Sequence, residues 1–212
     1  MLQEITEGKW VASIRRVLKL NGIGKGTDVA IVSESQSRPV LGQLCMLALY
    51  DLEANYSMIH LPTPEQTALV PVKSTGASNA IAGKRHVIEA LKRVEVVVDV
   101  TVEGLIHSEE WPEIEEAGAR LFTICNEHPE ILERTEPTAD LGPKVNLGIR
   151  MLQDANEMRV TSNVGTDLMI DIKDAPCGGT PGYSTSPGGV AHWPGGLCLC
   201  FPGENTTNGR IV

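Results

Sequence analysis

The stretch that decides the fold is Val94–Val100, V-E-V-V-V-D-V, which is the most strand-like run in the chain. No polar residue interrupts it between Val96 and Val98, and such a run is typical of a strand buried on both faces. Helix-like patterns flank it at residues 81–91 and 108–117, and a further strand-like segment follows at 121–124. This order predicts parallel strands joined by a crossover helix.

The same alternation continues outward from this stretch. The predicted helices are 10–20, one that opens at Pro39, and 141–153, and the predicted strands are 29–32 and 56–61. A long loop is expected from Pro62 to about Gly76. We therefore expect an α/β fold, in which a Rossmann-like, doubly wound and mostly parallel sheet with helices on both faces occupies residues 1–155.

The character of the sequence changes after about residue 157. Strands are expected at 159–162, 168–172, 197–201 and 210–212, with a Gly/Pro-rich loop over 175–196. No closing element follows the last of them. These features predict an incomplete β-rich unit at 156–212, the truncated start of a catalytic domain.

Composition excludes several classes of function. The chain has 18 basic and 27 acidic residues, so its net charge is 18 − 27 = −9. That balance disfavours binding to nucleic acid and to anionic membrane surfaces. No apolar stretch is long enough to span a bilayer, the start of the chain lacks an apolar signal core, and the five cysteines are scattered without a CxxC pair. We expect a cytoplasmic protein.

Familiar nucleotide and metal motifs fail on their context. The glycine-rich segment Gly22–Gly26 precedes a predicted strand, whereas a dinucleotide fingerprint follows a strand and opens a helix. Among the five histidines, no pair shows the i, i+4 spacing or the His-x-Asp pattern of a facial triad. The sequence therefore predicts no metal site within this chain.

Polar residues follow the predicted strands, where ligands bind in doubly wound folds. They are Ser33, Glu34, Ser35, His60, Thr101, Glu103, His107, Asn126 and Glu127. Because strand ends lead into loops and loops are polar, this pattern indicates the place of a site without its chemistry.

A more distinctive segment is 179–196, G-T-P-G-Y-S-T-S-P-G-G-V-A-H-W-P-G-G. Its imidazole and indole, His192 and Trp193, suit a flat polar ring, since an indole stacks and an imidazole exchanges protons. The alternative is structural, with Trp193 filling the core and His192 capping a turn.

This segment resembles the 2,5-dihydroxypyridine 5,6-dioxygenase family, which is related in fold to the aminopeptidase T-like metallopeptidases. The matching motifs are Gly182-Tyr183, Pro187-Gly188, His192-Trp193-Pro194 with Gly196, Gly165-Thr166-Asp167, Leu105–Glu110, and Asn208-Gly209 with Val212. The His-Trp-Pro loop is the most specific of them. The resemblance covers the length of the chain and implies the N-terminal portion of such an enzyme.

The resemblance implies a non-haem Fe(II), extradiol-type dioxygenase that adds both atoms of O₂ to a dihydroxypyridine-like aromatic and opens its ring. The family's iron ligands, two His and one Asp, lie in a segment outside this chain, so none of the residues here is a predicted ligand. His192 becomes the candidate catalytic acid/base beside the substrate hydroxyl. His107 becomes a candidate catalytic lid residue, contributed to a neighbouring subunit's site in a homo-oligomer.

The resemblance also implies three substrate-binding residues, Trp193, Tyr183 and Thr180. Some members carry an acidic residue before the Gly-Tyr pair, where this chain has Thr180. This difference bears on which substrate is used. Two other functions stay open: a metallopeptidase of the related aminopeptidase group, and a non-catalytic oligomerisation module. The metal ligands in the downstream sequence would distinguish a metallopeptidase from a dioxygenase. Metal analysis of the purified chain bears on the oligomerisation module.

Overall fold

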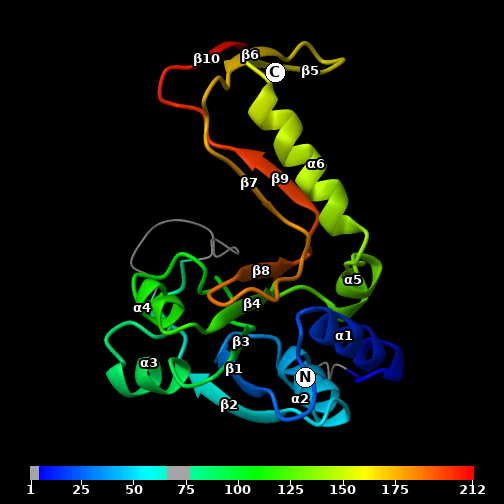
Figure 1. Ribbon diagram of the computed structural model, residues 1–212, viewed down its shortest axis with the longest axis vertical. Coiled ribbons are helices and arrows are strands. Elements are labelled where there is room, and N and C mark those ends of the chain that lie inside the picture. Colours follow the sequence, from blue (N-terminus) through cyan, green and yellow to red (C-terminus); the bar gives the residue numbers. More distant parts are fainter. Residues whose placement is uncertain (1–4, 66–76) are drawn as a thin grey trace. The chain divides into compact units, whose positions relative to one another are not determined.

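The computed structural model describes residues 5–65 and 77–212 (Figure 1). Its contacts divide the chain into two compact units. Unit 1 comprises Met1–Thr138 with Gly182–Gly195, and unit 2 comprises Ala139–Pro181 with Gly196–Val212. The sequence-based division after residue 155 stays a prediction about independently folding domains. Most of the loop expected over residues 62–76 lies outside the described residues.

Unit 1 is built on a five-stranded parallel sheet with the order β2-β1-β3-β4-β8. The strands are β1 (Asp28–Glu34), β2 (Asn55–Leu61), β3 (Val96–Asp99), β4 (Arg120–Ile124) and β8 (Val190–Trp193). Val97 of β3 pairs with Ala30 on one side and Leu121 on the other. The valine-rich run is thus the central strand, which confirms the predicted parallel α/β fold.

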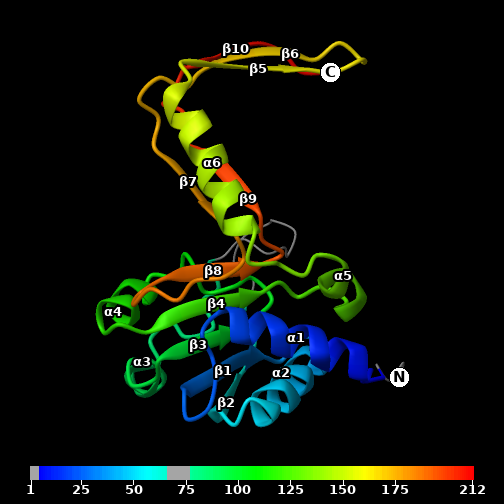
Figure 2. The ribbon, with the colours of Figure 1, turned by 45° about the vertical axis from the view of Figure 1, so that its right-hand side comes forward.

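Helices cover both faces of this sheet, as predicted (Figures 1 and 2). They are α1 (Gly8–Leu20), α2 (Pro39–Asp51), α3 (Arg85–Leu91), α4 (Trp111–Glu116) and α5 (Pro129–Arg134). Successive strand residues point to opposite faces. Val96 and Val98 accordingly join the core cluster that contains α1 and α2, whereas Val97 joins the one that contains α3 and α4.

Two predicted helices are shorter than expected. Residues 81–83 and 109–110 form turns, so α3 begins at Arg85 and α4 at Trp111. Gly83 has a φ of +68°, a left-handed conformation that a helix cannot contain. The helical spacing of apolar residues in the sequence therefore extends beyond the residues whose backbone is helical.

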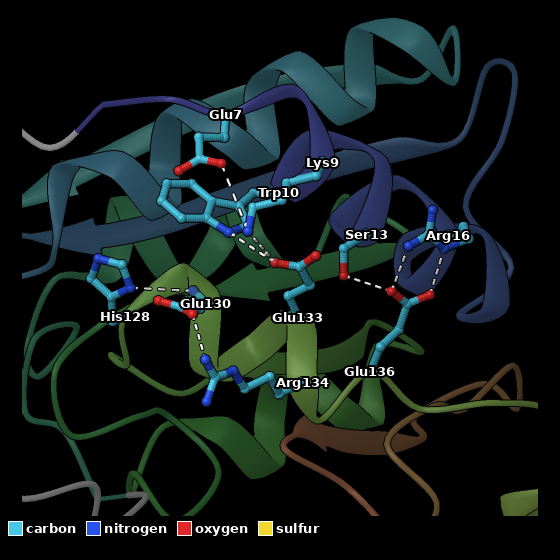
Figure 3. A network of polar contacts seen from close by, with 10 residues as sticks. All are labelled: Glu7, Lys9, Trp10, Ser13, Arg16, His128, Glu130, Glu133, Arg134 and Glu136. Atoms are coloured by element: carbon cyan, nitrogen blue, oxygen red, sulfur yellow. Dashed lines mark hydrogen bonds and ion pairs between the residues drawn. The ribbon is translucent and has the colours of Figure 1, made fainter.

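Helix α1 shows how the sequence pattern becomes packing. Trp10, Ile14, Val17 and Leu18 are buried, as their helical spacing predicts. Polar contacts then attach the same helix to α5 and the residues after it (Figure 3). The Trp10 indole donates to Glu133, and the Ser13 hydroxyl donates to Glu136. Arg16 binds Glu136 with two nitrogens at 2.6 and 2.7 Å, a bidentate geometry.

The expected loop at 175–196 is wrong in part, because it contains two strands. One of them, β8, pairs with β4 and forms the fifth strand of the main sheet. Glycines and a proline flank this four-residue strand, so its sequence pattern is typical of a loop. Ala191 and Trp193 both point into the core, as alternate residues of a strand do.

Unit 2 consists of one helix and two small antiparallel sheets. Its elements are α6 (Leu141–Asp154), β5 (Glu157–Thr161), β6 (Asp167–Asp171), β7 (Cys177–Thr180), β9 (Leu197–Cys200) and β10 (Thr207–Arg210). One sheet has the order β10-β6-β5 and the other pairs β7 with β9. The strands expected at 159–162 and 168–172 are confirmed, and the last strand lies three residues earlier than expected. Within the described residues, no helix is long and apolar enough to cross a membrane.

Candidate functional site

Because the strands of unit 1 are parallel, their carboxyl ends meet at one edge of the sheet, and the polar residues expected there are brought to it. The Ser33 hydroxyl lies 2.9 Å from Nδ1 of His60. The Thr123 hydroxyl donates to Asp99 at 2.9 Å. His192 pairs with Thr123 in the sheet register, so the candidate base also lies at this edge.

His192 is half-buried on the edge strand β8, and one of its ring nitrogens is already fixed. Its Nδ1 lies 2.7 Å from the main-chain oxygen of Pro194. A carbonyl oxygen only accepts hydrogen bonds, so Nδ1 carries the proton in this contact. In the neutral ring Nε2 is then the acceptor, which is the tautomer that a general base requires.

Trp193 alternates with His192 along the strand and points the other way. Its side chain is 0% exposed, belongs to the core cluster of α1 and α2, and donates from Nε1 to the Thr135 carbonyl at 3.0 Å. The Trp193–Pro194 peptide bond is cis. A fully buried indole has no face free for a substrate ring, so the stacking role expected for Trp193 conflicts with its place in the core.

His107 lies on the loop between β3 and α4 and is exposed. Asp99, at the end of β3, holds the start of this loop: its Oδ1 accepts from the amide and hydroxyl of Thr101, and its Oδ2 accepts from the amide of Leu105 and the hydroxyl of Thr123. Sequence reasoning missed Asp99 as a positioning residue. The available signal was a single carboxylate interrupting an otherwise apolar strand.

Tyr183 and Thr180 fall in different units. Tyr183 is half-buried and follows Gly182, whose φ is +91° and whose added Cβ would lie only 3.0 Å from Pro137. Asn21 fixes this segment by accepting from the amide of Ser184 at 3.0 Å. Thr180, in β7 of unit 2, is half-buried and accepts from the amide of Gly196. The substrate-binding roles of Tyr183 and Thr180 stay predictions.

Two buried carboxyls lie at the sheet edge. Burial raises the pKa of Asp99, and its hydrogen bonds from Thr101, Leu105 and Thr123 oppose the rise. Burial also raises the pKa of Glu34, against hydrogen bonds from the Val102 amide and the Thr63 hydroxyl, and the charge of Asp99 adds to the rise. Glu34 is 1% exposed, and its Oε2 has no hydrogen-bond partner among the described residues. Both carboxyls hold loops in place, and Glu34 also lines the hollow at this edge.

A hollow of about 370 Å³ opens beside β1 and β2 at the same edge. Its lining includes the Ser33–His60 pair and the apolar side chains of Met46 and Met58. No group of three or more His, Cys, Asp or Glu side chains suited to a metal gathers anywhere in residues 5–65 and 77–212. The described side chains at this edge can therefore position loops and exchange a proton.

Known proteins of one family resemble this chain in sequence and in fold. The profile of the 2,5-dihydroxypyridine 5,6-dioxygenase family matches residues 9–212. The chain belongs to that family. The 2,5-dihydroxypyridine 5,6-dioxygenase of Pseudomonas putida KT2440 is 27% identical over 210 residues, which are 98% of this chain and 59% of the relative.

The solved structure of the 2,5-dihydroxypyridine dioxygenase from Pseudomonas putida KT2440 superposes with a TM-score of 0.83 at 28% identity. The match covers 96% of this chain and 58% of that one. The chain thus spans about three-fifths of the length of these family members. Its fold and family are shared with them along nearly its whole length.

Proposed function

We propose that this chain forms part of a ring-opening dioxygenase that uses O₂ and acts on a dihydroxypyridine-like aromatic, with extradiol-type cleavage. The observation that carries the proposal is the family match over residues 9–212, together with a TM-score of 0.83 to the solved dioxygenase. The position of His192 at the carboxyl edge of the sheet, with one ring nitrogen fixed, fits proton transfer beside a substrate hydroxyl.

A metal cofactor, Fe(II), belongs to this proposal, and the described residues do not fit it because they offer no cluster of three ligands. We propose that the ligands come from the part of the enzyme that this chain does not include. The isolated chain should then hold far less than one iron per chain after anaerobic loading and desalting. Tight one-to-one binding that is lost on substituting one of this chain's own His or Asp residues would contradict the assignment.

His192 is the proposed acid/base. With Nδ1–H donated to the Pro194 carbonyl, Nε2 can accept a proton from a substrate hydroxyl and return it later. Trp193, on the opposite side of β8, anchors the strand in the core and so fixes the position of the imidazole beside it. We therefore propose an indirect role for Trp193, and substrate contacts for Tyr183 and Thr180.

His107 is the proposed lid residue, contributed to the active site of a neighbouring subunit in a homo-oligomer. Its exposure and the support of its loop by Asp99 fit such a role. Complementation tests it in the complete enzyme. If two subunits share each site, mixing inactive His107→Ala and His192→Ala subunits under exchange conditions restores activity. No recovery, in oligomers shown to contain both variants, contradicts the shared site.

The function itself is tested on the complete enzyme that contains this chain. With iron and 2,5-dihydroxypyridine, we expect one O₂ consumed per ring opened, measured with an oxygen electrode and by loss of the ring's ultraviolet absorption. A family of related hydroxylated pyridines then defines the ring preference. Peptide hydrolysis without O₂ uptake would favour the metallopeptidase, and the absence of both activities would favour an assembly module.

A further inference from the structure

The outer face of α2 differs from that of an ordinary surface helix. Between Pro39 and Tyr50 the helix carries no charged side chain, and its only one is Asp51 at the last position. A helix at the surface normally presents charged residues to water, whereas one that is apolar all round is covered. Here Leu47 is 46% exposed and Tyr50 is 74% exposed. The composition of α2 therefore indicates a face that a further layer covers.

A groove of about 350 Å³ lies beside this face, between α1 and α2. Gly8, Val11 and Ala12 of α1, with Leu47 and Tyr50 of α2, give it mostly apolar walls. Arg15 and Asp51 also line it, and neither makes an ion pair or side-chain hydrogen bond within the described part of the chain. An apolar groove, an exposed aromatic side chain that lines it and two opposite charges thus occur together.

We propose that this α1–α2 face is the contact between two copies of the chain, related by a two-fold axis. A two-fold axis makes a patch face itself, so a contact from residue i to residue j is repeated from j to i. Tyr50 of each copy then enters the groove of the other, and Arg15 faces the partner's Asp51 twice. Tyr and Arg are enriched in the centres of protein interfaces.

The two charges favour a second copy over other partners. A basic partner would neutralise Asp51 and repel Arg15, and an acidic partner would do the reverse. A partner surface with one positive and one negative charge around an apolar centre can pair with Arg15 and Asp51 at the same time. The chain's own α1–α2 face is such a surface. The inference does not depend on the proposed ring-opening chemistry, since its test reads association and not activity.

Sedimentation equilibrium of the 212-residue chain tests the contact. We expect a concentration-dependent dimer, and we expect Tyr50→Glu to weaken its association at least tenfold because a carboxylate would enter an apolar groove. Ile131→Glu is the matched control: Ile131 is a 45% exposed apolar residue on α5, away from the groove. A monomer at all concentrations, or Tyr50→Glu and Ile131→Glu with equal effects, overturns the proposal.

Charge reversal tests the two-fold pairing. Arg15→Asp and Asp51→Arg should each weaken the dimer about tenfold, because each reverses two symmetry-related pairs. The double variant exchanges the charges on both copies and should regain most of the wild-type affinity. Circular dichroism verifies that all variants fold. Additive losses in the double variant would show that Arg15 and Asp51 do not face each other, and would overturn the proposed interface.

Discussion

Units 1 and 2 belong to one chain but reach stability by different routes. In unit 1 every central strand is buried on both faces, and two clusters of core residues lie on either side of the sheet. In unit 2 the buried residues are only Val145 and Ile172, although the whole of that unit is described. The difference shows that one chain can contain a sheet with a large hydrophobic core and a second unit with almost no core.

The three-stranded sheet of unit 2 shows why. Cross-strand pairs place Met158 beside Ile170 and Val160 beside Leu168 on one face. The other face carries polar residues, including the ion pair between Arg159 and Asp167. An amphipathic sheet needs a second layer on its apolar side, yet Val160 remains 40% exposed. The stability of unit 2 in isolation should therefore be far lower than that of unit 1.

Removing one large aromatic from each unit should give the largest contrast. Trp193→Ala creates a cavity in the core of unit 1 and should lower the free energy of unfolding by about 3–5 kcal/mol. Phe201→Ala, at a side chain 61% exposed in unit 2, should change it by less than about 0.5 kcal/mol. Urea unfolding followed by circular dichroism measures both. Equal losses would mean that unit 2 has a core of its own.

The next contrast concerns buried and exposed carboxyls. Each oxygen of Asp99 accepts one main-chain amide, from Thr101 and from Leu105. Asp99→Asn therefore loses one of these bonds whichever way its amide is turned, which should cost about 1–3 kcal/mol. Asp154→Asn, at an exposed residue in unit 2, is the matched control and should be neutral. A neutral Asp99→Asn would show that the loop does not depend on this carboxylate.

Asp99 also gives unit 1 a characteristic pH dependence. Since burial raises its pKa in the folded state, the folded chain holds the proton more tightly than the unfolded chain. Its contribution to stability should fall as pH rises from the usual value of 3.8 through the raised folded value. Asp99→Asn should remove this part of the slope. A slope unchanged in the variant would assign it to other groups, with Glu34 as the first to test.

How much could be predicted is clear from particular elements. The spacing of Trp10, Ile14, Val17 and Leu18 identified a helix and its buried face. Uninterrupted valines identified the central strand. β8 was missed because its strand signal comes from two alternating side chains between glycines and a proline, and its pairing with β4 is distant in sequence. The hydrogen bonds from Thr123 to Asp99 and from Ser184 to Asn21 join residues distant in sequence, so no local pattern predicts them.

A smaller effect on the free energy of unfolding is expected from the contact between α1 and the residues after α5. Burial raises the pKa of Glu136, but hydrogen bonds from Arg16 and Ser13 outweigh it and the net pKa is lowered. The stabilisation is thus fully present above pH 4.5 and is lost as pH falls through the lower folded value. Glu136→Gln should cost about 0.5–1 kcal/mol at neutral pH after solvent screening, and nothing at low pH. Thermal unfolding at both pH values measures this difference.

The smallest effect should come from unit 2. Arg159 and Asp167 form an ion pair at 2.8 Å, but their side chains are 62% and 53% exposed. Water and salt screen such a pair, so Asp167→Asn should leave the melting temperature unchanged within error. A measurable loss that disappears in high salt would indicate that the hairpin of β5 and β6 is less solvated than the structure shows.

The central claim is that the two sides of β8 have different tasks: Trp193 lies in the core, and His192 is proposed to exchange a proton with the substrate. Turnover of the iron-loaded complete enzyme carrying His192→Gln tests it most directly, with His86→Gln on α3 as a control. We predict a loss of about two to four decades in turnover for His192→Gln, with unchanged iron content and unfolding, and no loss for His86→Gln. Full activity of His192→Gln, or loss of its iron, would contradict the account.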